Sequence, residues 1–215
     1  MIREKIRLRE KFKLLIQRRE SLVHELFGGN NWYERLKEYF PEREMKSKQH
    51  FETLLKEKYE MYQVLEEEDY VVVYFEQLDY IFIDYIIVSG NTRGKGIGGK
   101  VLDLFKEKGK AIILEVEPIT NEDPDSEKRI RFYERHGFLK MENIGYERIH
   151  HVTKELNKMD IYCWSTKERA EDWVMEKMSE VYTNVHGYKT EELYGVQPQS
   201  TNEILWLRKS LQEVN

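Results

Sequence analysis

The stretch VSGNTRGKGIGGK (residues 88–100) joins an apolar run, which ends at Val88, to a segment whose apolar residues recur at helical spacing. It holds five of the chain's 12 glycines. Glycine lets the backbone approach a ligand closely, and free N–H groups at the start of a helix bind phosphate oxygens. The stretch therefore predicts a strand, a turn and a helix that bind a phosphate-bearing ligand. The alternative is a tight turn that needs glycine for its geometry alone.

The spacing of Gly94, Gly96 and Gly99 also satisfies the dinucleotide-binding fingerprint, and the acidic Glu115 follows in the next predicted strand. That fingerprint places its first glycine directly after a strand, whereas five residues separate Val88 from Gly94 here. The rest of the sequence lacks repeated parallel βαβ units. A dinucleotide site is therefore the weaker interpretation.

Gly94, Gly99 and Lys100 have the spacing of the phosphate loop that binds nucleoside triphosphates. That loop continues with a Ser or Thr whose hydroxyl binds magnesium, and Val101 stands in its place. The missing metal ligand argues against an NTPase.

The same stretch resembles the acetyl-CoA loop of GNAT acetyltransferases, in which an Arg or Gln precedes, by three residues, a Gly-x-Gly or Gly-x-Ala. Arg93, Gly96 and Gly98 occupy those three places. The segment FYERHGF (residues 132–138) resembles the second motif of the family, a helix that carries Phe-Tyr and ends at Gly-Phe. Together the two motifs are more specific than either one, and the resemblance covers residues 62–138. The chain is thus similar to GNAT N-acetyltransferases.

This resemblance implies an α/β (α+β) fold, with a mixed, mostly antiparallel sheet and helices on both faces. The sheet would splay between the strand ending at Val88 and the strand 111–117, and acetyl-CoA, as acyl donor, would lie in the splay. Ser126 stands where the family usually has Asn. The expected cofactor-binding residues are Ile86, Ile87, Val88, Arg93, Gly94, Lys95, Gly96, Ile97, Gly98, Gly99 and Ser126.

Hydrophobic periodicity predicts the order of the elements. We expect an N-terminal helical segment (1–60), interrupted at Gly28, Gly29 and Pro41, an acyl-CoA-binding core (61–164) and a C-terminal extension packed on the core (165–215). The core is expected to contain strands 62–65, 70–75 and 80–88, a helix 98–108, a strand 111–117, a helix 126–136, and strands 139–150 and 159–164.

The C-terminal extension carries two further signals. Ser165 and Glu168 have capping-box spacing, which predicts that the last long helix begins at Ser165. Residues 204–207 fit either an edge strand or a helical turn.

Acyl transfer to an amine needs a base that removes a proton from the ammonium group and an acid that protonates the departing thiolate. We expect the base to be Glu115, in a stretch similar to the base-bearing strand of the ribosomal-protein alanine acetyltransferases. Asp84, which shares strand parity with Ile86 and Val88, is the second candidate, and Glu117 is the third. The resemblance makes Tyr133 the acid; the alternative for Tyr133 is an aromatic that anchors its helix. The acceptor amine is not identified.

Composition and charge indicate which classes of binding partner are unfavourable. The 215 residues carry a formal net charge of −5, mixed along the chain, which disfavours nucleic acid as a partner. No apolar run has the length of a membrane span, so a cytoplasmic protein is expected. Cys163 is the one cysteine, and His150 and His151 would point to opposite faces of a strand, so no metal site is expected.

Two other hypotheses stay open. One is an acyl-CoA-binding or regulatory module of the same fold without catalytic activity; the other is a nucleotide-binding enzyme that uses residues 94–100. Exposed strands at the edge of a sheet make a homodimer conceivable.

Overall fold

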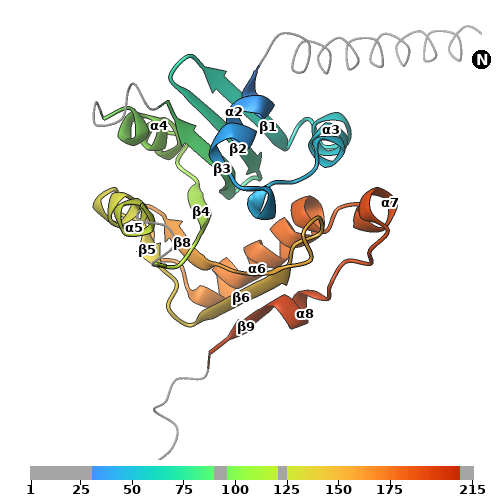
Figure 1. Cartoon of the computed structure of the whole chain (residues 1–215). Helices are drawn as coiled ribbons and strands as arrows, with labels where there is room; N and C mark the ends of the chain where they lie inside the picture. Colours follow the sequence, from blue (N-terminus) through green and yellow to red (C-terminus); the bar gives the residue numbers. More distant parts are fainter. Residues whose placement is uncertain (1–30, 90–95, 121–124, 209–215) are drawn as a thin grey trace, which may run out of the picture.

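The computed structural model describes residues 31–89, 96–120 and 125–208. A mixed sheet of six strands forms its centre, in the order β1-β2-β3-β4-β8-β5 (Figure 1). The strands are β1 (Tyr62–Glu67), β2 (Tyr70–Glu76), β3 (Tyr80–Val88), β4 (Ala111–Val116), β8 (Asp160–Trp164) and β5 (Leu139–Lys140). The expected antiparallel meander of the first three strands is confirmed.

Strands β3 and β4 are parallel, whereas the other neighbouring pairs of this sheet are antiparallel. Their pairing runs from Tyr80 opposite Ala111 to Ile83 opposite Leu114, where it stops. Beyond that point β3 continues to Val88 beside β2 alone, and β4 continues beside β8. The expected splay is therefore present, and the two halves of the sheet diverge at β4 in Figure 1.

A second sheet has the order β7-β6-β9. It contains β7 (Leu156–Lys158), β6 (Ile144–Ile149) and β9 (Leu205–Leu207). The prediction of one strand over 139–150 is wrong, because the backbone turns after β5: the Ile144 N–H donates to the Met141 carbonyl. The turn moves β6 out of the first sheet and into the second.

The helices and turns cover both faces of the central sheet (Figure 1). They are α2 (Trp32–Tyr39), the 3₁₀ turn η1 (Glu42–Glu44), α3 (Lys48–Glu57), α4 (Ile97–Lys106), α5 (Ser126–Arg135), α6 (Glu171–Val181), the π-helical turn η3 (Tyr182–His186), α7 (Thr190–Tyr194) and α8 (Thr201–Ile204). The expected long helix before Gly28 lies outside the described residues.

Two expectations about the C-terminal extension need correction. Helix α6 begins at Glu171, after Ala170, and the Ser165 hydroxyl instead accepts a bond from the Lys167 N–H. A capping box does occur, at Ser200 and Glu203 on α8. Residues 201–207 satisfy both alternatives, since α8 ends at Ile204 and β9 follows directly.

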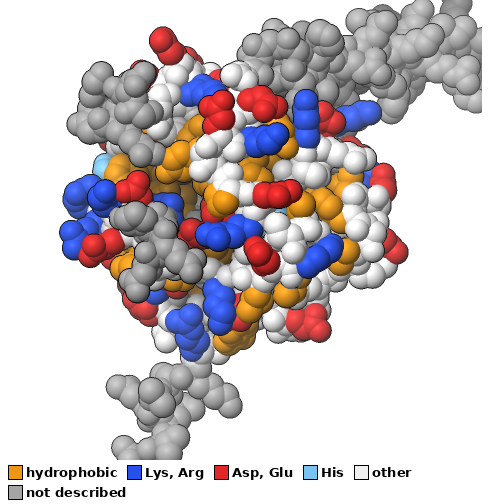
Figure 2. All heavy atoms as spheres, viewed as in Figure 1, with side chains coloured by type: hydrophobic (Ala, Val, Ile, Leu, Met, Phe, Trp, Pro, Cys, Tyr) orange, Lys and Arg blue, Asp and Glu red, His pale blue; other side chains and the backbone are white. Residues whose placement is uncertain are grey.

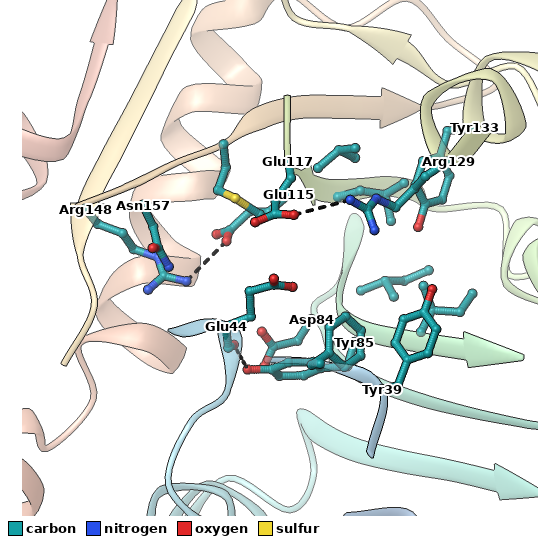
Figure 3. A pocket seen from close by; sticks show the side chains of 16 residues that line it. Tyr39, Glu44, Asp84, Tyr85, Glu115, Glu117, Arg129, Tyr133, Arg148 and Asn157 are labelled. Atoms are coloured by element: carbon teal, nitrogen blue, oxygen red, sulfur yellow. Dashed lines mark hydrogen bonds and ion pairs between the residues drawn. The ribbon is translucent and has the colours of Figure 1, made fainter. Parts of the chain in front are cut away.

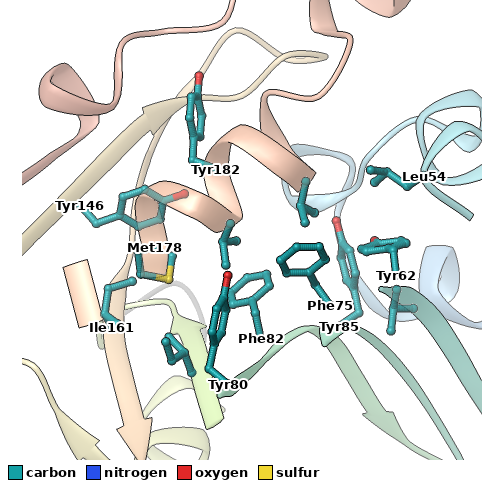
Figure 4. Packing of buried hydrophobic residues seen from close by; sticks show 14 of the residues in the cluster. Leu54, Tyr62, Phe75, Tyr80, Phe82, Tyr85, Tyr146, Ile161, Met178 and Tyr182 are labelled. Atoms are coloured by element: carbon teal, nitrogen blue, oxygen red, sulfur yellow. The ribbon is translucent and has the colours of Figure 1, made fainter. Parts of the chain in front are cut away.

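Two apolar clusters hold these layers together. One packs α4 and α5 on the sheet, through Val101, Phe105 and Ile130. The other joins α2, α3 and α6 to the opposite face, and its large rings from β1 to β3 meet Met178 of α6 (Figure 4). Burial of about 25 cal/mol per Å² of apolar surface makes such contacts the main stabilising force. Segments at both ends of the described chain thus belong to one core.

None of the helices within the described ranges combines the length and the apolar character needed to cross a membrane.

Candidate active site

A groove of about 600 Å³ lies between the end of β3, the start of α4 and helix α5. Seven of the residues expected to bind the cofactor line it: Ile86, Ile87, Val88, Gly96, Ile97, Gly98 and Gly99. Helix α5 adds three basic residues, Lys128, Arg129 and Arg135, and His136 follows directly after the helix. Figure 2 shows a hollow lined by hydrophobic side chains on the visible face, with Lys and Arg side chains beside it. Apolar walls with basic margins suit a long molecule that carries phosphates.

The glycines at the start of α4 have different roles. Gly96 caps the helix with a φ of +76°, and a Cβ placed there would meet no atom within 4 Å, so this position opens on the groove. A Cβ at Gly98 would lie 3.0 Å from the Phe132 ring, and one at Gly99 only 2.6 Å from the His136 ring. Gly98 and Gly99 therefore also let α4 pack closely against α5.

Four expected cofactor residues are not seen in the groove. Arg93, Gly94 and Lys95 lie outside the described residues. Ser126 is buried, and its hydroxyl exchanges hydrogen bonds with the backbone of Thr120 at 3.3 and 3.4 Å. Ser126 thus ties the start of α5 to the loop after β4, and it does not line the groove.

A smaller cavity of about 90 Å³ lies beside this groove, lined by residues of β3 and β4 where the two strands splay. The two spaces share Tyr39, Ile86, Arg129 and Tyr133. Figure 3 shows the acidic side chains of this cavity facing one another across it, from β3, from β4 and from the segment after α2. A molecule in the groove and one in the cavity would therefore meet beside Tyr133.

Tyr133 combines burial with a position at this junction. Its ring packs against Phe132 and Phe138, with centroids 5.4 and 5.7 Å apart. Burial raises the pKa of Tyr133 to about 12, against the opposing effect of Arg129. The phenol is thus protonated at neutral pH, as a proton donor must be.

Glu115 and Asp84, the two carboxylates ranked first as bases, are engaged in buried pairs. Glu115 accepts a hydrogen bond from His186 at 2.8 Å and lies 3.5 Å from Arg148. Burial acts to raise the pKa of Glu115, but these two partners outweigh it and lower the pKa. Asp84 receives bonds of 2.7 and 2.8 Å from Lys46. The partners of Glu115 stabilise its carboxylate and make it a weak proton acceptor.

The strand parity expected for Asp84 is wrong. The pairing of β2 with β3 shifts between Val73 and Tyr74, which leaves Asp84 in a bulge without a partner. A bulge reverses the alternation of side chains. Asp84 consequently accepts a bond from Tyr62 on the opposite face of the sheet from Ile86.

Glu44 is the functional candidate that the sequence did not reveal. It lines the small cavity opposite Glu117, which lies 3.3 Å from Arg129. Burial and the neighbouring Glu117 raise the pKa of Glu44 to about 7. Glu44 lies in a connection between two short helices, where a lone acidic residue normally belongs to the solvated surface, so no local signal marks it.

Hydrogen bonds fix the backbone that carries Glu44. The Tyr85 hydroxyl donates to the Glu44 carbonyl at 2.7 Å and accepts from the Lys46 N–H at 3.2 Å. The Asn157 amide donates to the Arg43 carbonyl at 3.0 Å. The 3₁₀ turn η1 is thereby attached both to β3 and to β7.

The histidines also differ from expectation. His150 and His151 follow the end of β6, and both line a small space of about 10 Å³, together with His50 and His186. The argument from opposite strand faces is therefore wrong. Burial, which comes first, and nearby cations lower the pKa of His150 and His151 to about 4. Within the described ranges, no group of three or more His, Cys, Asp or Glu residues could hold a metal ion.

Comparison with known proteins agrees with this geometry. The family model described as "Acetyltransferase (GNAT) domain" matches residues 58–140. The Bacillus subtilis (strain 168) protein named "Putative acetyltransferase YjbC" is 46% identical over 175 residues, which are 81% of this chain and 91% of that protein. A GNAT-family protein from Bacteroides thetaiotaomicron shares the fold at a TM-score of 0.60 with 19% identity, over 83% of this chain and 96% of its own. The chain belongs to the GNAT family of acetyltransferases.

Proposed function

We propose that this protein transfers the acetyl group of acetyl-CoA to a primary amine by direct attack of the amine on the thioester. The observation that carries the proposal is the position of Tyr133, which lines both a groove suited to a phosphate-bearing molecule and an adjacent acidic cavity. When bound, acetyl-CoA supplies the activated acetyl group. Separate spaces that meet at one proton donor suit a reaction between two substrates.

The groove has the features that coenzyme A requires. The start of α4 offers backbone N–H groups, and Lys128 and Arg135 of α5 add positive charge for the phosphates. The apolar wall formed by Ile86 and Val88 suits the pantetheine arm. Beyond Ile83 the edge of β3 that faces the splay has no pairing strand among the described residues, so its peptide groups are available to orient that arm.

Tyr133 would act as the general acid. Tyr133 lines both spaces, so it lies where a thioester in the groove would meet an amine in the cavity. A phenol with a pKa of about 12 is fully protonated at neutral pH, so it holds a proton to donate as negative charge develops on the departing sulfur. Donation of this proton assists the breaking of the C–S bond.

A carboxylate of the cavity would remove a proton from the amine. Glu115 and Asp84 were the candidates from the sequence, but each is already paired with buried cations. General-base catalysis is most effective when the pKa of the base lies near the working pH. A carboxylate with a raised pKa therefore suits this step better than Glu115.

Release of free thiol from acetyl-CoA, measured across a panel of primary amines, tests the proposal. An N-acetyltransferase releases thiol only when an accepted amine is present. The alternative, a module that binds acyl-CoA without catalysis, shows binding of coenzyme A and no thiol release.

A further inference from the structure

We propose that Glu44, sharing a proton with Glu117, binds the ammonium group of an unbranched primary alkylamine and removes its proton. This inference rests on the proposed acetyl transfer and names both its base and its acceptor class. Glu44 lies outside residues 58–140, which match the family domain. The base would thus be supplied by the segment between α2 and α3.

The ion pairs of the cavity lead to Glu44. Four carboxylates and two guanidinium groups line it, and three of the carboxylates have a cationic partner. The pairs are Asp84 with Lys46, Glu115 with Arg148, and Glu117 with Arg129. Among the described residues, Glu44 has no ion pair of its own, and it faces Glu117 across the cavity (Figure 3). With Lys46 counted, the carboxylates that line the cavity outnumber their cationic partners by one.

Two carboxylates that face each other cannot both ionise readily, and they share a proton or bind a cation. Burial and Glu117 raise the pKa of Glu44, while Arg129 and Arg43 oppose the rise. An alkylammonium ion placed between the two carboxylates would replace the shared proton. The same pair could then accept a proton from that ion.

The charged and titratable groups around Glu44 come from every side of the cavity. They include Glu117 after β4, Arg129 and Tyr133 on α5, Arg43 on η1, Asp84 and Tyr85 on β3, Glu115 on β4, Arg148 on β6 and Tyr39 on α2. Lys46, His50, His150, His151, His186 and Tyr194 surround a second, smaller space that Glu44 also lines. Since Arg129 and Arg148 are already paired with acids, an acceptor that carries its own carboxylate beside the amine would meet a net negative surface. This excludes α-amino acids as good acceptors.

The size of the cavity limits the shape of the acceptor. The cavity is small, with a volume of about 90 Å³ against about 600 Å³ for the groove. This accommodates a nitrogen and the first carbons of a straight chain. The rings of Tyr39, Phe40 and Tyr85 line the same cavity, and aromatic faces attract ammonium groups. We therefore expect a chain branched at the carbon that bears the nitrogen to fit this cavity less well than a straight chain.

The proton and electron balance of the reaction is complete without a further reactant. One proton passes from the ammonium group to the Glu44–Glu117 pair and then to solvent. The nitrogen lone pair forms the C–N bond as the C–S bond breaks. The Tyr133 hydroxyl protonates the departing sulfur, and a second nitrogen proton restores the phenol. One proton is released for each acetyl group transferred.

Kinetics of Glu44→Gln with n-butylamine as acceptor test the inference. We expect kcat/KM to fall by about 10²–10⁴-fold, as for loss of a general base. In the wild-type protein kcat/KM should rise with pH through about 7, because the pair accepts a proton only when it is ionised, and Glu44→Gln should abolish this rise. Glu42→Gln is the matched control, since Glu42 is an exposed residue of the same 3₁₀ turn.

A second acceptor separates proton removal from a structural effect. Aminoacetonitrile is a primary amine that is already neutral at pH 7, so it needs no base for deprotonation. Glu44→Gln should reduce kcat/KM far less with aminoacetonitrile than with n-butylamine. In the wild-type protein n-butylamine should be a better acceptor than sec-butylamine or glycine.

Three results would overturn the inference. The first is a Glu44→Gln variant with wild-type kcat/KM and an unchanged pH profile. The second is an equal loss with both acceptors, which would assign Glu44 a structural role. The third is a preference for sec-butylamine or glycine over n-butylamine. Absence of thiol release by the wild-type protein with every amine would refute the proposed function itself.

Discussion

Replacement of Gly96 by Glu, compared with Gly109→Glu, distinguishes the groove from a merely tight turn. Both glycines have positive φ angles, +76° and +69°, and at both positions a Cβ would meet no atom within 4 Å. The two substitutions therefore impose similar backbone strain and the same change of charge. Gly96 lines the groove, whereas Gly109 follows the C-terminal end of α4 and lies outside it.

The expected losses follow from this comparison. A non-glycine residue in the left-handed region costs about 1–2 kcal/mol, so both variants should melt a few degrees lower, at about 2–4 °C per kcal/mol. At position 96 the added carboxylate would also face the phosphates. Like charges about 4 Å apart repel by about 4 kcal/mol at an effective dielectric constant near 20. This corresponds to about 10³-fold weaker binding.

Calorimetric titration with coenzyme A measures this difference, and thermal melting with coenzyme A, ATP and NAD tests the choice of ligand. We expect Gly109→Glu to bind coenzyme A like the wild-type protein and Gly96→Glu to lose nearly all binding. A ligand that binds only the native state raises its melting temperature. Equal affinity in the two folded variants, or stabilisation by ATP or NAD with none by coenzyme A, would refute the assignment of the groove.

Tyr133→Phe should lower kcat by about 10²–10⁴-fold with little change in acetyl-CoA affinity or melting temperature. Tyr162 is a buried tyrosine of the same cluster, and the control variant Tyr162→Phe should keep its activity. Near-normal turnover of Tyr133→Phe, with chemistry rate-limiting, would make Tyr133 only an anchor. Glu115→Gln should lower the free energy of unfolding by about 3–5 kcal/mol at pH 7, because Arg148 loses its buried partner. The pKa of Glu115 is lower in the folded than in the unfolded state, so the stability that Glu115 contributes is present above its unfolded-state pKa and is lost as the pH falls. Denaturant unfolding should therefore show the stabilities of Glu115→Gln and the wild type converging in acid. A difference in free energy of unfolding that stays constant across pH would contradict this stabilising role of the Glu115 carboxylate, which also pairs with His186.

Local patterns were sufficient to predict the segments that enclose the groove. The strand that ends at Val88, the turn, and helices α4 and α5 are contiguous segments with strong periodicity, and they enclose the groove as expected. Glycine spacing could not show that Gly99 allows α4 to pack on α5. That contact forms only because the fold places His136, 37 positions further along the chain, against Gly99. Hydrophobic periodicity predicts a helix or a strand, but it does not show which other elements pack against it.

The arrangement of the small acidic cavity could not be predicted, because tertiary contacts create it. A bulge at Asp84 reverses the parity on which its placement depended. The His186 bond to Glu115 joins residues 71 positions apart and comes from a π-helical turn that has no sequence signature. The pKa of Glu44 is raised only because the fold partly buries Glu44 and brings it beside Glu117. Each of these effects arises from burial beside a distant partner.

The central claim is that this protein joins an amine to the acetyl group of acetyl-CoA. The most direct measurement follows free thiol and acetylated n-butylamine together, by a thiol-reactive dye and by mass spectrometry. We predict that both products form in equal amounts, in proportion to protein, and only when the amine is present. Binding of coenzyme A without thiol release, across the panel of primary amines, would contradict the claim and indicate a binding module.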